Sequence, residues 1–193
     1  MSFDRLFKFE QDLAEYTGAP YVVVTDGCTH AIELCLRYDR PQFLAFTAFT
    51  YLSIPMLMHH LQINYILTSE QWQGEYQFHG TRIWDSARLC RQGMYREGQM
   101  QCLSFGHTKP LHIGRGGAIL LDDEAAYNKI IRMRYDGRDL SITPWNEQLT
   151  FRVGYHYKPT IEEAERCLEL LPKLEYTTTD GFYPDCRNIQ IVH

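Results

Sequence analysis

The first part of the chain shows two kinds of hydrophobic spacing. Residues 3–16 carry apolar side chains at close to helical spacing, and a Gly18-Ala-Pro20 stretch follows them. Residues 21–25 form a short, Val-rich run that predicts a buried strand. A second helical pattern then extends to about Tyr38. The opening segment therefore predicts a helix, a strand, a tight turn and another helix.

The rest of the chain continues this alternation of short apolar runs and helical patterns. Further strands are predicted at residues 43–46, 63–67, 81–85, 100–105 and 117–121, and further helices at residues 50–61, 122–135 and 161–174. Short strands that alternate with helices predict a three-layer α/β domain with a mainly parallel sheet of about six or seven strands. We expect residues 1–174 to form this domain and residues 175–193 to be a loop-like C-terminal tail.

Residues that can carry chemistry follow several of the predicted strands. The turn Asp26-Gly27-Cys28-Thr29 opens a helix, whose free N–H groups and dipole suit a phosphate, and Thr29 adds a hydroxyl. A simple helix cap explains the same turn equally well. Asp85 ends another strand. Since α/β proteins place their sites at strand ends along one edge of the sheet, we expect these residues to converge.

The segment from Ser104 to Gly117 is the most informative part of the sequence. It places Lys109 in a polar, glycine-rich loop between two apolar strands. A desolvated ammonium is costly without a partner, and a partly desolvated lysine loses its proton more easily and becomes a nucleophile. This favours a Schiff base between Lys109 and an aldehyde cofactor. The alternative is a surface hairpin with an ordinary solvated lysine.

The order strand, Ser-x-x-x-x-Lys, Gly-rich turn and strand closely resembles the lysine segment of the pyridoxal-phosphate-dependent nucleotide-sugar aminotransferases of the DegT/StrS type. The resemblance implies that Lys109 is the Schiff-base lysine and the catalytic acid and base, and that Ser104 binds the cofactor phosphate. The turn at Cys28 and Thr29 is similar to the phosphate-binding turn of that family. Tyr51 matches the aromatic residue that stacks on the cofactor ring in the family.

Two further segments carry the resemblance. Asp85 matches the carboxylate that binds the pyridine nitrogen, although Arg88 stands where the family has Gln or His. The loop 154–160 resembles a family loop that reaches across a dimer interface, which implies that Lys158 or His156 touches the partner's phosphate. A plain basic loop is the alternative interpretation of these residues.

The resemblance implies the large domain of a pyridoxal-phosphate-dependent transferase, with the aspartate-aminotransferase-like fold and pyridoxal 5'-phosphate as cofactor. It also implies a homodimer, glutamate as amino donor and a keto sugar nucleotide as acceptor. The family's C-terminal small domain, and a strand–helix unit between Tyr51 and Asp85, have no counterpart in this sequence. A minimal aminotransferase and a non-catalytic or degenerate binding protein of the same fold therefore both stay open. A sugar dehydratase is disfavoured because Lys109 is present, where such enzymes have histidine.

Composition narrows the alternatives. The 193 residues carry a formal net charge of -5, which argues against nucleic acid as the main partner. No apolar run approaches the length of a membrane span, and the charged start lacks the core of a signal peptide. Six cysteines without a C-x-x-C pair argue against a zinc site. These features predict a cytoplasmic protein that binds neither nucleic acid, membrane nor metal.

Overall fold

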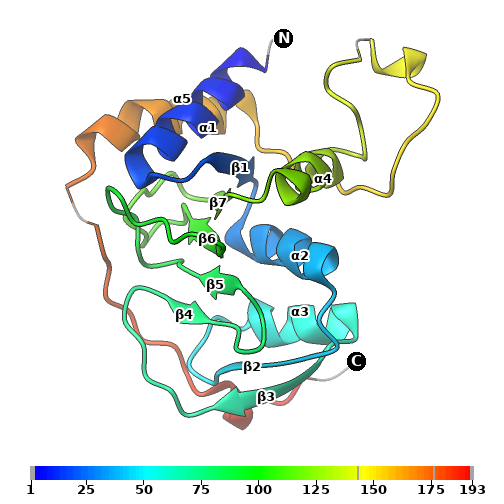
Figure 1. Ribbon diagram of the computed structural model, residues 1–193. Coiled ribbons are helices and arrows are strands. Elements are labelled where there is room, and N and C mark those ends of the chain that lie inside the picture. Colours follow the sequence, from blue (N-terminus) through cyan, green and yellow to red (C-terminus); the bar gives the residue numbers. More distant parts are fainter. Residues whose placement is uncertain (1–2, 143, 176, 192–193) are drawn as a thin grey trace.

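The computed structural model describes residues 3–142, 144–175 and 177–191 (Figure 1). The helices are α1 (Asp4–Thr17), α2 (Cys28–Asp39), α3 (Ser53–Leu61), α4 (Glu124–Arg134) and α5 (Ile161–Leu170). The strands are β1 (Tyr21–Thr25), β2 (Phe43–Thr47), β3 (Asn64–Thr68), β4 (Tyr76–Gln77), β5 (Ile83–Asp85), β6 (Met100–Ser104) and β7 (Gly117–Leu121). Short 3-10 helices lie at Trp145–Glu147, Leu171–Lys173 and Cys186–Asn188. The predicted α/β class is confirmed, and β4 lies in a segment for which the sequence predicted neither helix nor strand.

The strands form two sheets. A five-stranded sheet has the order β1-β7-β6-β5-β4, and β2 and β3 form a separate parallel pair. Strands β5 and β6 are also parallel, whereas β7 runs antiparallel to both of its neighbours and β4 runs antiparallel to β5. The connection from β6 to β7 at residues 105–116 contains no helix, and such a helix-free return suits antiparallel neighbours. The main sheet is therefore mixed, with three antiparallel pairs and one parallel pair, where the sequence predicted a mainly parallel sheet of six or seven strands. The loop with Lys109 lies between two of its central strands.

Alternating side chains of the sheet strands fill two separate cores. Val23 of β1 packs with side chains of α2 and α4, whereas Val22 and Val24 pack with side chains of α1 and α5. Figure 1 shows the same layering, with α1 and α5 on one side of the sheet and α2 and α4 on the other. Because a strand points successive side chains to opposite faces, an apolar run without polar breaks is buried on both.

Several helix ends carry residues of the types that usually cap helices, whereas other helix starts have no side-chain cap. Gly18, at a φ of 78°, ends α1, and Asp123 caps α4 by accepting a hydrogen bond from the Ala126 N–H at 2.9 Å. Thr160 and Glu163 form a capping box at the start of α5. No side chain caps the starts of α1, α2 and α3, and of these the start of α2 lines the predicted site, so its first N–H groups are available to a ligand there.

The C-terminal segment 177–188 packs along the body of the protein. The Cys90 N–H donates to the Thr177 carbonyl at 2.8 Å, the Thr179 N–H to the Arg88 carbonyl at 3.1 Å, and the Cys186 N–H to the Ala48 carbonyl at 2.9 Å. Cys186 is buried. The described part of the tail is irregular apart from the 3-10 helix at Cys186–Asn188, and these bonds tie it to two segments next to the predicted site. Among the described residues, no helix has the length and apolar character needed to cross a bilayer.

Candidate active site

One cavity collects most of the residues predicted to form the site. It has a volume of about 440 Å³ and lies where β5, β6 and the start of α2 meet. Its lining includes six predicted site residues: Cys28, Thr29, Tyr51, Asp85, Ser104 and Lys109. Its size falls within the range of small-molecule sites. Residues that lie far apart in the sequence thus surround one volume, as convergence at one sheet edge predicts.

The start of α2 forms one end of this cavity. The Thr29 hydroxyl lies 2.7 Å from the hydroxyl of Ser53, which begins α3 and also lines the cavity. Strand β7 approaches this turn so closely that a Cβ on Gly117 would lie 2.6 Å from the backbone nitrogen of Cys28. Uncapped N–H groups, the helix dipole and two hydroxyls make this end suitable for an anion such as a phosphate.

Asp85 lies in the wall of the cavity and is almost fully buried. One carboxylate oxygen accepts a hydrogen bond from the Tyr76 hydroxyl at 2.9 Å, and the other accepts one from the Ala87 N–H at 3.0 Å. The Thr50 hydroxyl lies 2.6 Å from that of Tyr76 and extends the network. Burial raises the pKa of Asp85, although the two donated hydrogen bonds and the charge of Lys109 oppose the shift. A buried carboxylate of this kind is suited to a cationic partner inside the cavity.

Cys28 is poorly placed to act as a nucleophile. Desolvation, followed by the negative charge of Asp85, raises the pKa of its thiol well above the usual value. A thiol that stays protonated near neutral pH is a weak nucleophile. Cys28 therefore contributes its backbone N–H and its bulk to the cavity.

Lys109 also lines the cavity. The side chain is half-buried, and its Nζ donates a hydrogen bond to the Tyr183 hydroxyl at 2.9 Å. Tyr51 is 61% exposed and lies edge-on to Tyr183, with ring centroids 6.2 Å apart. Its ring is thus free to cover the face of a flat ligand. The cavity combines an amine, a buried carboxylate, an aromatic ring and an anion-binding helix start.

Lys158 does not line this cavity. Its Nζ lies 4.9 Å from the ring centroid of Phe3 and 5.1 Å from that of Tyr135. Burial, and then the nearby positive charge of Arg134, lowers the pKa of Lys158. A role for Lys158 in the site of a partner subunit stays a prediction.

Three contributors were missed by sequence reasoning. They are Ser53, Tyr76 and Tyr183. Ser53 lies close to the singled-out Tyr51, so the start of α3 could have been recognised as part of the site. Tyr76 lies in a segment for which the sequence predicted neither helix nor strand. Tyr183 lies 74 positions after Lys109, and no local pattern connects the two.

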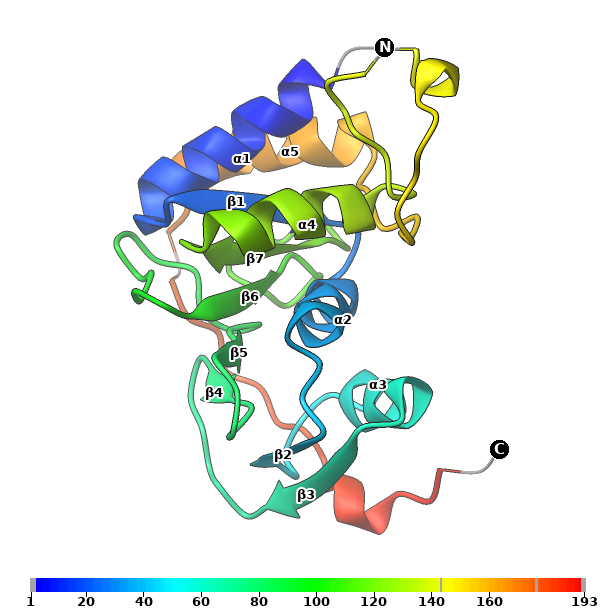
Figure 2. The ribbon, with the colours of Figure 1, turned by 45° about the vertical axis from the view of Figure 1, so that its right-hand side comes forward.

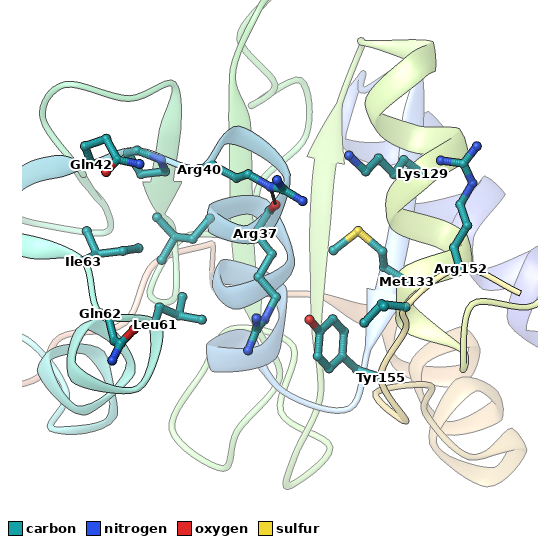
Figure 3. A pocket seen from close by; sticks show the side chains of 13 residues that line it. Arg37, Arg40, Gln42, Leu61, Gln62, Ile63, Lys129, Met133, Arg152 and Tyr155 are labelled. Atoms are coloured by element: carbon teal, nitrogen blue, oxygen red, sulfur yellow. Dashed lines mark hydrogen bonds between the residues drawn. The ribbon is translucent and has the colours of Figure 1, made fainter.

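A larger cavity, of about 630 Å³, lies between α2, α3 and α4 (Figure 3). Its wall includes the cationic side chains of Arg37, Arg40, Lys129 and Arg152. Arg37 is occupied, because it pairs with Glu33 at 2.7 Å and lies over a tyrosine ring. The lining includes no carboxylate, histidine, serine or cysteine among the described residues. The smaller cavity is therefore the better candidate for catalysis.

Comparison with known proteins gives an independent view of the same region. Residues 86–179, which include Lys109, match the sequence model of the DegT/DnrJ/EryC1/StrS aminotransferase family. No curated protein matches the chain.

Solved structures share the fold. A DegT DnrJ EryC1 StrS aminotransferase from Brucella abortus superposes with a TM-score of 0.71 at 16% identity, covering 89% of this chain and 59% of its own. The sugar aminotransferase CalS13 from Micromonospora echinospora gives 0.73 at 14% identity, covering 89% and 61%. NtdA from Bacillus subtilis, crystallised with the cofactor PMP, gives 0.72 at 18% identity, covering 88% and 48%.

All three solved structures show the same fold for this chain, which is that of the pyridoxal-phosphate-dependent aminotransferases. This chain spans only about half to three fifths of the length of these structures. The family match covers residues 86–179, a little under half of the chain, so this part is similar to the DegT/DnrJ/EryC1/StrS aminotransferase family, and the fold is shared with solved aminotransferases.

Proposed function

We propose that the cavity around Lys109 binds pyridoxal 5'-phosphate and that the protein is an aminotransferase. The residues present fit this group. The uncapped start of α2, with the hydroxyls of Thr29 and Ser104, suits its phosphate, and Asp85 offers a buried carboxylate to its ring nitrogen. Bound there, the cofactor would supply an electron-withdrawing ring that stabilises negative charge on the neighbouring carbon.

Each side chain then has a defined task. Lys109 would hold the cofactor at its aldehyde group and would move the proton at the substrate carbon. Asp85 would keep the ring nitrogen protonated, while the Tyr76 hydroxyl and the Ala87 N–H hold the Asp85 carboxylate in place. Tyr51 would pack against the ring, which would contribute about 1 kcal/mol beyond the burial of area.

We further propose that the amino group passes from glutamate to a keto sugar nucleotide. The support is the resemblance of the site residues and the name of a structural neighbour as a sugar aminotransferase. The elements retained around the cavity address the cofactor and not the sugar. We therefore expect cofactor binding to be more robust than selectivity for one acceptor.

The convergence of Lys109, Asp85 and the start of α2 on one cavity carries this proposal, and an absorption spectrum tests it. Addition of pyridoxal phosphate to the protein is expected to produce a visible band, because the aldehyde becomes bonded to Lys109. Lys109→Ala is expected to abolish the band. The matched control is Lys173→Ala, in an exposed lysine outside the cavity, which is expected to keep it. Absence of the band in the unchanged protein would reject the cofactor assignment.

The second candidate is a protein that binds the cofactor without transferring an amino group. Arg88 favours it, because this residue differs from the family pattern and its guanidinium is engaged by the Asp180 carbonyl at 2.6 Å. Addition of glutamate to the loaded protein separates the two candidates. Conversion of the cofactor to its aminated form supports an aminotransferase, and an unchanged spectrum supports the binding protein.

We also propose that the protein forms a homodimer through the segment that follows α4. This segment projects from the body (Figure 2) and exposes several apolar side chains. They are Trp145 (54%), Leu149 (96%), Phe151 (44%) and Val153 (80%). Exposed apolar groups that cluster in this way mark interaction sites. The adjoining loop 154–160 would then bring Lys158 toward the partner's cofactor phosphate.

Leu149→Asp is expected to weaken the dimer by at least about tenfold, because it places a charge in an apolar contact. Sedimentation equilibrium over a range of concentrations measures the effect. Met56→Ser, at an exposed apolar residue on α3, is the control and is expected to leave association unchanged. A strictly monomeric unchanged protein would contradict the proposal.

Two finer assignments complete the proposal. Residues 1–174 form the transferase-like domain and 175–193 its tail. A cytoplasmic location is inferred from the thiols, because all six cysteines are free and reduced thiols persist in that compartment.

A further inference from the structure

The tail places one side chain directly against the candidate nucleophile. Tyr183 accepts the hydrogen bond of Lys109 Nζ at 2.9 Å. Its ring stacks on Trp72, with centroids 5.9 Å apart and an angle of 16° between the planes. Tyr183 also lines the cavity, together with Asp85 and Lys109. The Tyr183 hydroxyl therefore contacts Lys109, which lines the cavity, whereas the Tyr183 ring packs on Trp72, which is not among the lining residues.

Arg88 holds this part of the tail in place. Its guanidinium donates to the Asp180 carbonyl at 2.6 Å and lies 4.7 Å from the centroid of the Tyr183 ring. The side chain is 7% exposed. Gly181 passes so close that a Cβ there would lie 1.9 Å from an Arg88 nitrogen. The tail and Arg88 thus fit together tightly beside the cavity.

We infer that Tyr183 is a positioning residue whose hydroxyl aims the Lys109 amine into the cavity, and that Arg88 keeps Tyr183 in that position. The reaction for which the amine is aimed rests on the proposed function; the contact itself does not. Orientation of a reacting group lowers the barrier because the entropy of alignment is lost before the reaction.

Tyr183 forms a wall of the cavity and does not fill it. With its side chain in place the volume is still about 440 Å³, within the range of small-molecule sites. The ring also remains 6.2 Å from that of Tyr51, edge to face. A ligand can therefore enter while the hydrogen bond to Lys109 persists.

Tyr183→Phe tests the inference, because it keeps the ring against Trp72 and removes only the hydroxyl. The first measurement is trace acetylation of the cofactor-free protein by acetic anhydride, read by peptide mass spectrometry against exposed Lys173. Without its hydrogen bond, Lys109 is expected to react about fivefold faster. The second is the rate at which the visible band grows with pyridoxal phosphate. A misaligned amine is expected to make this about tenfold slower.

Opposite signs in the two measurements separate positioning from simple shielding, which would accelerate both. Gly181→Ala, which forces Arg88 and the tail apart, is expected to reproduce both changes. Phe182→Ala, at a neighbouring side chain that is 86% exposed, is the matched control and is expected to change neither.

Equal acetylation of Lys109 in the unchanged protein and in Tyr183→Phe would overturn the inference, as would changes of the same sign in both measurements. If the unchanged protein gives no visible band, the proposed function fails. The acetylation result still decides whether Tyr183 holds Lys109, so the two failures are distinguishable.

Discussion

Asp85→Asn is expected to lower aminotransferase activity by about a hundredfold or more without destabilising the fold. Among the described residues, the cavity wall contains two acidic side chains, Asp85 and Asp26. Asp26 is already paired with Arg115 and His30, so the carboxylate of Asp85 is the one available to a ligand. Loss of a buried charge partner costs several kcal/mol, and each 1.36 kcal/mol on the barrier is tenfold in rate. Single-turnover kinetics of the loaded protein with glutamate measure the effect.

The stability of the fold, unlike the activity, is expected not to fall in Asp85→Asn, because asparagine can keep all the hydrogen bonds of the buried network. Its amide oxygen can accept from the Ala87 N–H while its amide nitrogen donates to the Tyr76 hydroxyl, which then donates to Thr50. The substitution also removes a carboxylate whose burial is unfavourable. Urea denaturation of the cofactor-free protein at pH 7 is expected to show a free energy of unfolding equal to or above that of the unchanged protein.

The difference in the free energy of unfolding between Asp85→Asn and the unchanged protein is expected to depend on pH. The pKa of Asp85 is raised in the fold from its usual 3.8, so the folded protein binds this proton more tightly than the unfolded chain does. Its contribution to stability is therefore fully present below pH 3.8 and is lost as the pH rises through the raised value. Asp85→Asn has no such titration, so its advantage in the free energy of unfolding over the unchanged protein is expected to grow as the pH rises. An advantage that shrinks as the pH rises would contradict a raised pKa of Asp85.

Arg134→Met is expected to destabilise the protein by about 3–5 kcal/mol, the largest effect on stability among these substitutions. The guanidinium is fully buried and pairs with Glu10 of α1, and it also donates to the Val24 carbonyl at 2.8 Å. The Val24 N–H in turn donates to Glu10 at 2.9 Å. Burial raises the pKa of Glu10, and the charge of Arg134 opposes this. Removal of the arginine leaves an unpaired carboxylate in the core.

Urea denaturation of three variants tests this explanation. Arg132→Met is the matched control on the same helix: its ion pair with Asp139 is partly exposed, and we expect a loss below about 1 kcal/mol. Glu10→Gln combined with Arg134→Met is expected to recover part of the stability, because no charge is then left unpaired. An equal loss in the single and double variants would show that packing, and not charge, determines the cost.

The elements of the fold were largely visible in the sequence. Residues 21–25 and 117–121 were predicted as strands with the bounds that the structure has, because both are short, uninterrupted apolar runs. The start of α3 was predicted three residues early, at Thr50, since the spacing of apolar residues does not mark where an uncapped helix begins. The pairing of β7 with β1 and β6 was not visible, because strand direction depends on the route of the chain and not on local pattern.

Some residues of the candidate site could likewise be recognised from the sequence, and others could not. Lys109, Asp85, Thr29 and Ser104 were recognisable because each follows a strand or opens a helix, and strand ends meet at one edge of an α/β sheet. The sequence by itself thus determined the α/β fold class and pointed to six of the residues that line the cavity. Only the tertiary structure decided that Tyr183 contacts Lys109, since that contact joins a central loop to a tail without periodic pattern. Such long-range contacts depend on backbone hydrogen bonds and on the fit around Gly181, which no local spacing encodes.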